Sequence, residues 1–122
     1  MTLGQAHLVA FIPSTDLERS REFYEGCLGL TVVDLNSYAL VLRSGDTTLR
    51  VTKVQQLKPH PFTVLGWEVP DIHAAIEALT GAVFQTYDGV EQDDHGVWTA
   101  PGGAKVAWFC DPDGNTLSIT EH

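Results

Sequence analysis

Apolar and polar residues alternate in two short segments of the chain that have nearly the same sequence. Segments 48–52 (TLRVT) and 116–120 (TLSIT) each follow a turn that contains a glycine. Alternation with a period of two is typical of a strand that buries one face and leaves the other open. A repeat of this kind predicts that one small module occurs twice in the chain.

The residues before the first of these segments predict the rest of the first module. A strand is expected over 6–12, and Pro13 is expected to end it because proline cannot donate to a ladder. Thr15 and Glu18 fit a capping box at the start of a helix. Apolar residues at helical spacing follow as far as Gly29, which suits a left-handed stop. Strands are predicted over 30–34, 38–43 and 47–54.

The second module repeats this order. It is predicted to have a strand over 62–69, a helix capped by Asp71, and strands over 82–87, 105–110 and 116–120. The chain is therefore expected to be one domain, 1–122, made of module 1–56 and module 60–122 with a short linker. The second module is longer because of segment 88–103, an acidic, glycine-rich loop with one tryptophan. Long loops in compact domains are usually functional or disordered, and the tryptophan favours a function.

Composition narrows the choice of partners. Hydrophobic residues make up 43% of the 122 residues, an ordinary globular balance, and the net charge is −9. A negative field of this size repels phosphate backbones and anionic lipid, so we expect neither nucleic acid nor membrane as a partner. The first residues carry no signal-peptide pattern, and two cysteines without CxxC spacing do not form a disulfide framework. We therefore expect a cytoplasmic protein with reduced thiols.

Three separated motifs resemble the vicinal oxygen chelate superfamily, which includes glyoxalase I, bleomycin-resistance proteins and extradiol dioxygenases. The motifs lie in 16–30 (DLERS, FYE and LGL), 67–72 (WEVPDI) and 109–115 (FCDPDGN). They occur in order over essentially the whole chain. The resemblance implies an α+β fold of two tandem βαβββ modules, whose curved mixed sheets form a cavity. It also implies a homodimer, with a monomer whose modules pair internally as the alternative.

Metal-dependent members of this superfamily hold a divalent ion with His, Glu or Gln side chains from the first and last strands of the modules. The resemblance places Val64, Ser118 and Arg50 at three of these positions. The fourth is Val9 by direct count, or His7 if the loop before the helix has gained two residues. A guanidinium cannot bind a cation, and one imidazole does not hold a catalytic ion. We therefore expect no metal or other cofactor at these positions.

Five residues are candidate ligand contacts: His7, Arg50, Glu68, Trp98 and Ser118. His7 and Glu68 are also the candidates for acid–base catalysis, and the alternative for His7 is a packing role. Arg50 is expected to pair with Glu68 or with an anionic ligand group, because an unpaired buried charge costs several kcal/mol. Trp98, together with Tyr87, is expected either to stack on a ligand or to pack.

The remaining residues that could bind a metal, stack on a ligand or act as a nucleophile are assigned structural roles. Asp93, Asp94 and His95 are metal-ligand types, but neighbouring residues in an acidic loop usually face water. Trp67 and Trp108 are assigned to the core. Neither cysteine has a visible activating partner, so no thiolate nucleophile is predicted.

The leading hypothesis is a protein that binds a small organic molecule in its cavity without a metal. Superfamily members that lack the metal ligands include drug-sequestering resistance proteins. Whether the protein is an enzyme stays open at this point. The alternative is a lyase, isomerase or dioxygenase for a small oxygen-rich substrate, with an unexpected metal near His7 and loop 88–103 or with His7 and Glu68 as acid and base. A scaffold subunit with a vestigial cavity is the third class.

Overall fold

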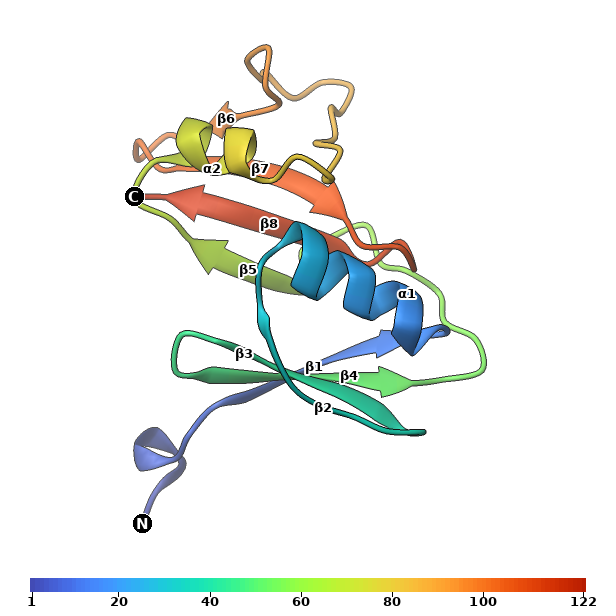
Figure 1. The fold of residues 1–122 in the computed structure, drawn as a ribbon. Helices are drawn as coiled ribbons and strands as arrows, with labels where there is room; N and C mark the ends of the chain where they lie inside the picture. The colour runs from blue at the N-terminus through green and yellow to red at the C-terminus, as the bar shows by residue number, and fades with distance from the viewer. The chain divides into compact units, whose positions relative to one another are not determined.

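The computed structural model describes all residues 1–122, and they form two compact units, 1–57 and 58–122. Each unit contains a strand, a helix and three further strands, in that order (Figure 1). In each, the first strand pairs in parallel with the last, and the remaining pairs are antiparallel. The predicted α+β fold of two tandem βαβββ modules is therefore confirmed.

The first unit is a four-stranded sheet with one helix. Its strands are β1 (Val9–Ser14), β2 (Thr31–Leu35), β3 (Ala39–Ser44) and β4 (Thr47–Lys53), in the sheet order β1-β4-β3-β2. A short 3₁₀ turn, η1 (Leu3–Gln5), precedes them. The helix begins as α1 (Leu17–Arg21) and continues as the π-helical turn η2 (Glu22–Cys27), ending before Gly29 at φ 78°. The predicted left-handed stop at Gly29 is confirmed.

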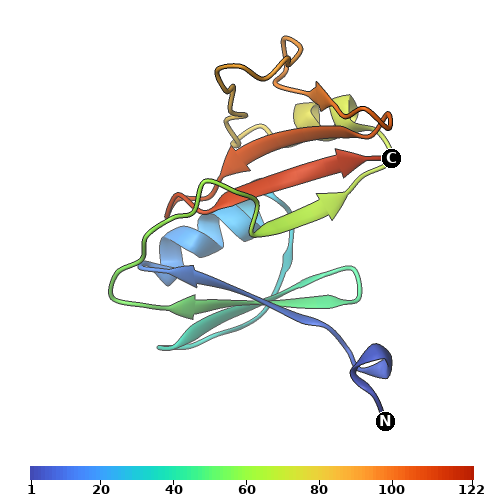
Figure 2. The same ribbon diagram turned by 180° about the vertical axis from the view of Figure 1, so that it is seen from behind.

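The second unit has the same topology. Its strands are β5 (Leu65–Glu68), β6 (Trp98–Thr99), β7 (Lys105–Cys110) and β8 (Thr116–Glu121), in the order β5-β8-β7-β6. Helix α2 (Ile72–Ala78) covers one face of this sheet over β7 and β8, as the view from behind in Figure 2 also shows. No helix of either unit is long and apolar enough to cross a membrane.

The two helices begin in the same way. Asp16 accepts a hydrogen bond from the amide of Arg19 at 3.1 Å, and Asp71 accepts one from the amide of Ala74 at 3.1 Å. Asp71 was predicted as the second cap, but the prediction of Thr15 as the first cap was wrong by one residue. An Asp at the N-cap satisfies an orphan amide and also places negative charge at the positive end of the helix.

The first strand differs from its prediction at both ends. It begins at Val9 rather than Ala6 and continues through Pro13, which is paired in register with Thr52. The amides of Thr48 and Val54 donate to the carbonyls of Leu8 and Ser14, so even-numbered residues of β1 face β4. Pro13 therefore lies on the side of this edge strand that faces away from β4, where a missing amide removes no ladder bond.

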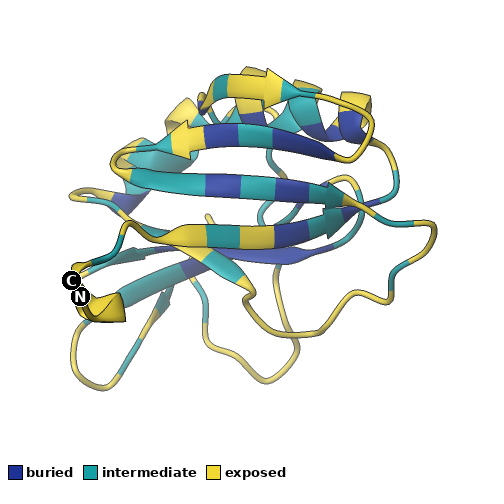
Figure 3. Cartoon of the chain, turned by 90° about the horizontal axis from the view of Figure 1, so that it is seen from below, coloured by how far each residue is buried: buried dark blue, intermediate teal, exposed yellow.

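The apolar core of each unit lies between its helix and the inner face of its sheet. Leu49 and Val51 of β4 are buried, as are Leu117 and Ile119 of β8, which confirms the inward face predicted from the alternation. Figure 3 shows that burial concentrates in the strands, whereas the connecting loops are exposed. The alternate residues of the same strands point to the other face of each sheet. We call this face, which lies away from the helix, the open face.

Segment 82–87 does not form the predicted strand. It contributes one isolated bridge, between Phe84 and Phe109, and one backbone hydrogen bond, from the amide of Gln85 to the carbonyl of Trp108. The edge strand of this sheet is instead β6, which lies inside the predicted loop 88–103. The loop is therefore partly built into the sheet.

Candidate functional site

The open face of the first unit brings together a cation and an exposed aromatic ring. Arg50 on β4 is paired in register with Phe11 on β1, and Phe11 is 65% exposed. Arg50 itself is half-buried, and within its own unit it forms no hydrogen bond or ion pair. A guanidinium with free donors beside an apolar ring suits an anionic group on an organic molecule.

His7 lies at the edge of the same face. It precedes β1, is exposed, and its Nε2 atom is 3.3 Å from the hydroxyl of Thr48. Thr48 and Arg50 are two residues apart on β4 and therefore point to the same side of the sheet. The structure thus places two of the sequence-predicted contacts, His7 and Arg50, on one face of the first unit.

The open face of the second unit carries three aromatic side chains in contact. Trp98 and Trp108 have ring centroids 6.1 Å apart, and Tyr87 meets Trp108 edge-on at 5.7 Å. We call Tyr87, Trp98 and Trp108 the aromatic surface. Trp108 is paired in register with Ser118, so the aromatic surface and Ser118 share one side of the sheet. The assignment of Trp108 to the core was wrong, whereas Trp67 lies on the helix side and stacks on Phe109.

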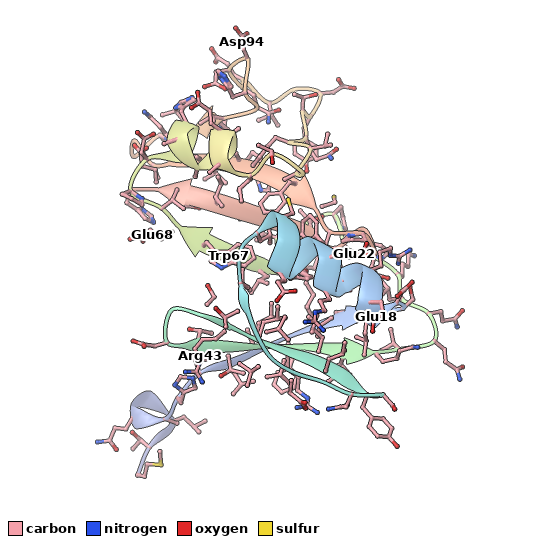
Figure 4. All side chains as sticks on the ribbon, in the orientation of Figure 1. Glu18, Glu22, Arg43, Trp67, Glu68 and Asp94 are labelled. Atoms are coloured by element: carbon pink, nitrogen blue, oxygen red, sulfur yellow. The ribbon has the colours of Figure 1, made fainter.

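The other predicted contacts of this unit differ in accessibility. Ser118 is buried, with its hydroxyl close to Gly66, where an added Cβ would lie 3.1 Å from Oγ. Glu68 stands at the end of β5 beside the C-terminus (Figure 4) and lies 3.5 Å from Nε2 of His122. Both side chains of that pair are mostly exposed, so the pair contributes little to stability.

Two weak acids at the aromatic surface, the phenol of Tyr87 and the thiol of Cys110, have raised pKa values. Burial, and to a lesser extent the nearby Cys110, raise the pKa of Tyr87. Burial also raises the pKa of Cys110, with Asp111 adding to it and a hydrogen bond to Thr116 opposing it. Cys110 therefore carries a thiol rather than a nucleophilic thiolate. This face offers rings and two protonated groups to a ligand, and Glu91 and Asp93 bring carboxylates to the adjoining hollow.

Loop 88–103 forms a hollow beside the aromatic surface. The hollow has a volume of about 390 Å³, and its lining includes Gln92, Val97 and Trp98. The side chain of Gln92 holds the loop in shape by donating to the carbonyls of Gln85 and Gly96 and accepting from the amide of Tyr87, at 2.8–3.0 Å. Trp98 thus belongs both to the hollow and to the aromatic surface.

The three metal-type residues of this loop do not act together. Asp94 lies at the outer tip of the loop and points away from the sheet of its unit (Figure 4). Asp93 and His95 instead meet His73 of α2. His73 is the residue that the sequence interpretation missed, because no local pattern joins a helix residue to a loop 20 residues further on.

The positions at which superfamily members hold a metal do not offer a suitable donor set here. Val64 supplies no side-chain donor, Ser118 supplies a hydroxyl, and Arg50 supplies only hydrogen-bond donors. His7 is the one imidazole near these positions. This set does not fit a divalent ion, which requires three or more imidazole, carboxylate or thiolate ligands.

Two βαβββ modules in tandem, each with a mixed four-stranded sheet, define the glyoxalase-like class of α+β proteins. The model of the Glyoxalase/Bleomycin resistance protein/Dioxygenase superfamily matches residues 4–119. The chain therefore belongs to this superfamily.

Solved structures agree with this assignment. A glyoxalase family protein from Enterococcus faecalis is 25% identical, with a TM-score of 0.72 and coverage of 99% of this chain and 100% of that one. A bleomycin resistance determinant encoded on transposon Tn5 is 21% identical, with a TM-score of 0.72 over 97% and 98%. A lactoylglutathione lyase from Agrobacterium tumefaciens is 16% identical, with a TM-score of 0.70 over 96% and 93%. No curated protein matches the chain.

Proposed function

We propose that this protein binds a small organic molecule with a planar ring, which stacks on the aromatic surface without the help of a metal at the sheet positions. The observation that carries the proposal is the contact of Tyr87, Trp98 and Trp108 on an open sheet face. Aromatic rings on an accessible face bind planar apolar groups through burial and ring stacking. A bleomycin resistance determinant shares this fold, and the notion of a bound drug-like molecule is consistent with that likeness.

Two further observations support binding over metal-assisted catalysis. The superfamily metal positions hold Val64, Ser118 and Arg50, which do not supply a ligand set. The raised pKa values keep the phenol of Tyr87 and the thiol of Cys110 protonated, so neither group is a ready nucleophile or base. Arg50, on the corresponding face of the first unit, is the candidate partner for an anionic group.

The experiment uses anilinonaphthalene sulfonate as the probe, since it has planar rings and one anionic group and fluoresces when it leaves water. Tyr87→Leu and Trp98→Leu should each weaken its binding by about 0.5–1.5 kcal/mol, which is roughly two- to tenfold in Kd. Tyr38→Leu is the matched control because Tyr38 is an exposed tyrosine of the other unit. Bleomycin is the second compound to titrate, because the resistance determinant suggests it.

The metal-free part of the proposal has its own measurement. Treatment with EDTA should leave the Kd of the probe unchanged.

Two results would contradict the proposal. Equal losses of probe affinity in Tyr38→Leu and Tyr87→Leu would refute binding at the aromatic surface. Loss of binding after EDTA, with recovery on addition of a divalent ion, would contradict metal-free binding of the probe.

A further inference from the structure

A second cluster of chemically capable side chains lies away from the sheet faces, where α2 meets loop 88–103. His73 is on the first turn of α2, and Asp93 and His95 are on the loop. One ligand atom of each lies within 4.8 Å of the other two. The Nε2 atom of His73 is 2.8 Å from Oδ2 of Asp93, and the rings of His73 and His95 meet edge-on at 5.3 Å. All three residues belong to the second unit.

The carboxylate of this cluster is held in a fixed orientation. Its Oδ1 atom accepts hydrogen bonds from the amides of His95 at 2.8 Å and Val97 at 2.9 Å, which leaves Oδ2 directed at His73. These contacts fix the carboxylate in place, so that one of its oxygens faces the two imidazoles of the cluster.

The dimensions of the cluster suit one small cation. Zinc binds imidazole nitrogen and carboxylate oxygen at about 2.0–2.2 Å, so two ligand atoms of a tetrahedral site lie roughly 3.4 Å apart. The ligand atoms of His73 and Asp93 are 2.8 Å apart and all three lie within 4.8 Å of one another, a range that includes this value. The side chains of His73 and Asp93 are 42% and 41% exposed, so small rotations can bring the atoms to the required distance. Three protein ligands leave the fourth position to water.

We propose that His73, Asp93 and His95 form a binding site for Zn²⁺ that ties loop 88–103 to α2. Two imidazoles and one carboxylate are ligands that zinc prefers, and a chain with a net charge of −9 attracts cations. The site contains none of the strand residues at the superfamily metal positions. It does not depend on ligand binding at the aromatic surface, although Asp93 and Trp98 both line the hollow in the loop.

The primary test is calorimetric titration of the metal-free full chain with zinc chloride at pH 7.5, with reduced thiols. We expect one zinc per chain in the wild type. His73→Ala and His95→Ala should each weaken binding by at least about tenfold, and their double variant should abolish it. Asp93→Asn is a third variant, which keeps an oxygen acceptor for the two amides while removing the charge.

Matched controls separate this site from zinc bound elsewhere. Asp94→Asn changes the carboxylate next to Asp93 in the sequence, which points away from the sheet (Figure 4). His60→Ala removes a histidine that lies outside the cluster and stacks on Phe62. Both should bind zinc like the wild type. Zinc should also slow hydrogen exchange of the Val97 amide, which donates to the Asp93 carboxylate.

Three results would overturn the proposal. They are the absence of saturable zinc binding to the wild type, full zinc binding by the His73→Ala/His95→Ala double variant, and equal losses in the controls. In each case the cluster would be a helix–loop ion pair only. The zinc result and the probe result are independent, because His73→Ala/His95→Ala leaves the aromatic surface intact.

Discussion

The turn between β7 and β8 allows the structural account to be tested with one substitution. Asp111 is 5% exposed, and its Oδ1 atom accepts hydrogen bonds from the amides of Asp113 at 3.0 Å and Asn115 at 2.9 Å. Its Oδ2 atom accepts a third from the side-chain amide of Asn115 at 2.8 Å, and Asn115 is 4% exposed. Asp111→Ala removes the acceptor of all three while the donors stay in place.

The expected loss of stability follows from these contacts. A hydrogen bond to a charged group contributes about 1.5–3 kcal/mol, and a buried donor left without a partner carries a further desolvation cost. Because the three bonds share one carboxylate, their contributions do not add fully. We therefore expect Asp111→Ala to lower the free energy of unfolding by at least about 3 kcal/mol. For a chain of this size, that corresponds to a fall in Tm of roughly 10 °C.

The assay is urea unfolding followed by tryptophan fluorescence, with Tm from far-ultraviolet circular dichroism. Asp46→Ala is the matched control, because Asp46 occupies the turn between β3 and β4 and is exposed. It should change the free energy of unfolding by less than about 0.5 kcal/mol. A loss below about 1 kcal/mol in Asp111→Ala, or equal losses in both variants, would refute the reasoning.

Three further predictions concern single residues. Arg50→Ala should weaken the binding of a small aromatic anion such as benzoate to the open face of the first unit by about 1.5 kcal/mol, measured by calorimetric titration; an unchanged Kd would contradict a ligand contact at Arg50. Gly66→Ala places a Cβ 3.1 Å from Oγ and 3.2 Å from the carbonyl oxygen of Ser118. It should lower the free energy of unfolding, measured in urea, by about 1–3 kcal/mol. Gly26→Ala is the control and should cause no such loss, because no atom lies within 4 Å of the added Cβ. The pKa of Asp93 is lower in the folded state than in the unfolded state. The ionised carboxylate therefore stabilises the fold above about pH 4, and this contribution is lost as the pH falls through the folded-state pKa. The Tm difference between wild type and Asp93→Asn should therefore shrink on acidification, and a difference that grows at low pH would contradict this sign.

The repeat and its alternation predicted that one module occurs twice, and the resemblance to the vicinal oxygen chelate superfamily implied the βαβββ fold of each module. Two strands with the same polar and apolar order, each after a glycine turn, predicted two equivalent modules, and the sheets have the same strand order. Strand ends were less predictable. Periodicity does not reveal which side of an edge strand faces its neighbour, and that side decides whether a proline such as Pro13 interrupts the ladder.

The candidate site was only partly predictable. Trp108 belongs to the apolar run 106–110, in which the sequence shows no alternation of apolar and polar residues; the structure buries its neighbours Ala107 and Phe109 and thereby places Trp108 on the open face. The meeting of His73 with Asp93 and His95 could not be predicted. It depends on how the 14 residues between the end of α2 at Ala78 and Asp93 bring the chain back to the helix, and no local pattern encodes that path. The homodimer and the cytoplasmic location stay predictions.

The most direct measurement of the central claim follows the three indole N–H resonances of the protein by NMR during titration with anilinonaphthalene sulfonate. Trp98 and Trp108 belong to the aromatic surface, while Trp67 stacks on Phe109 on the helix side of the same sheet. The account predicts saturable shifts of the Trp98 and Trp108 resonances, with the same Kd before and after EDTA treatment, and little change at Trp67. Shifts confined to Trp67, or no shift at any of the three, would contradict it.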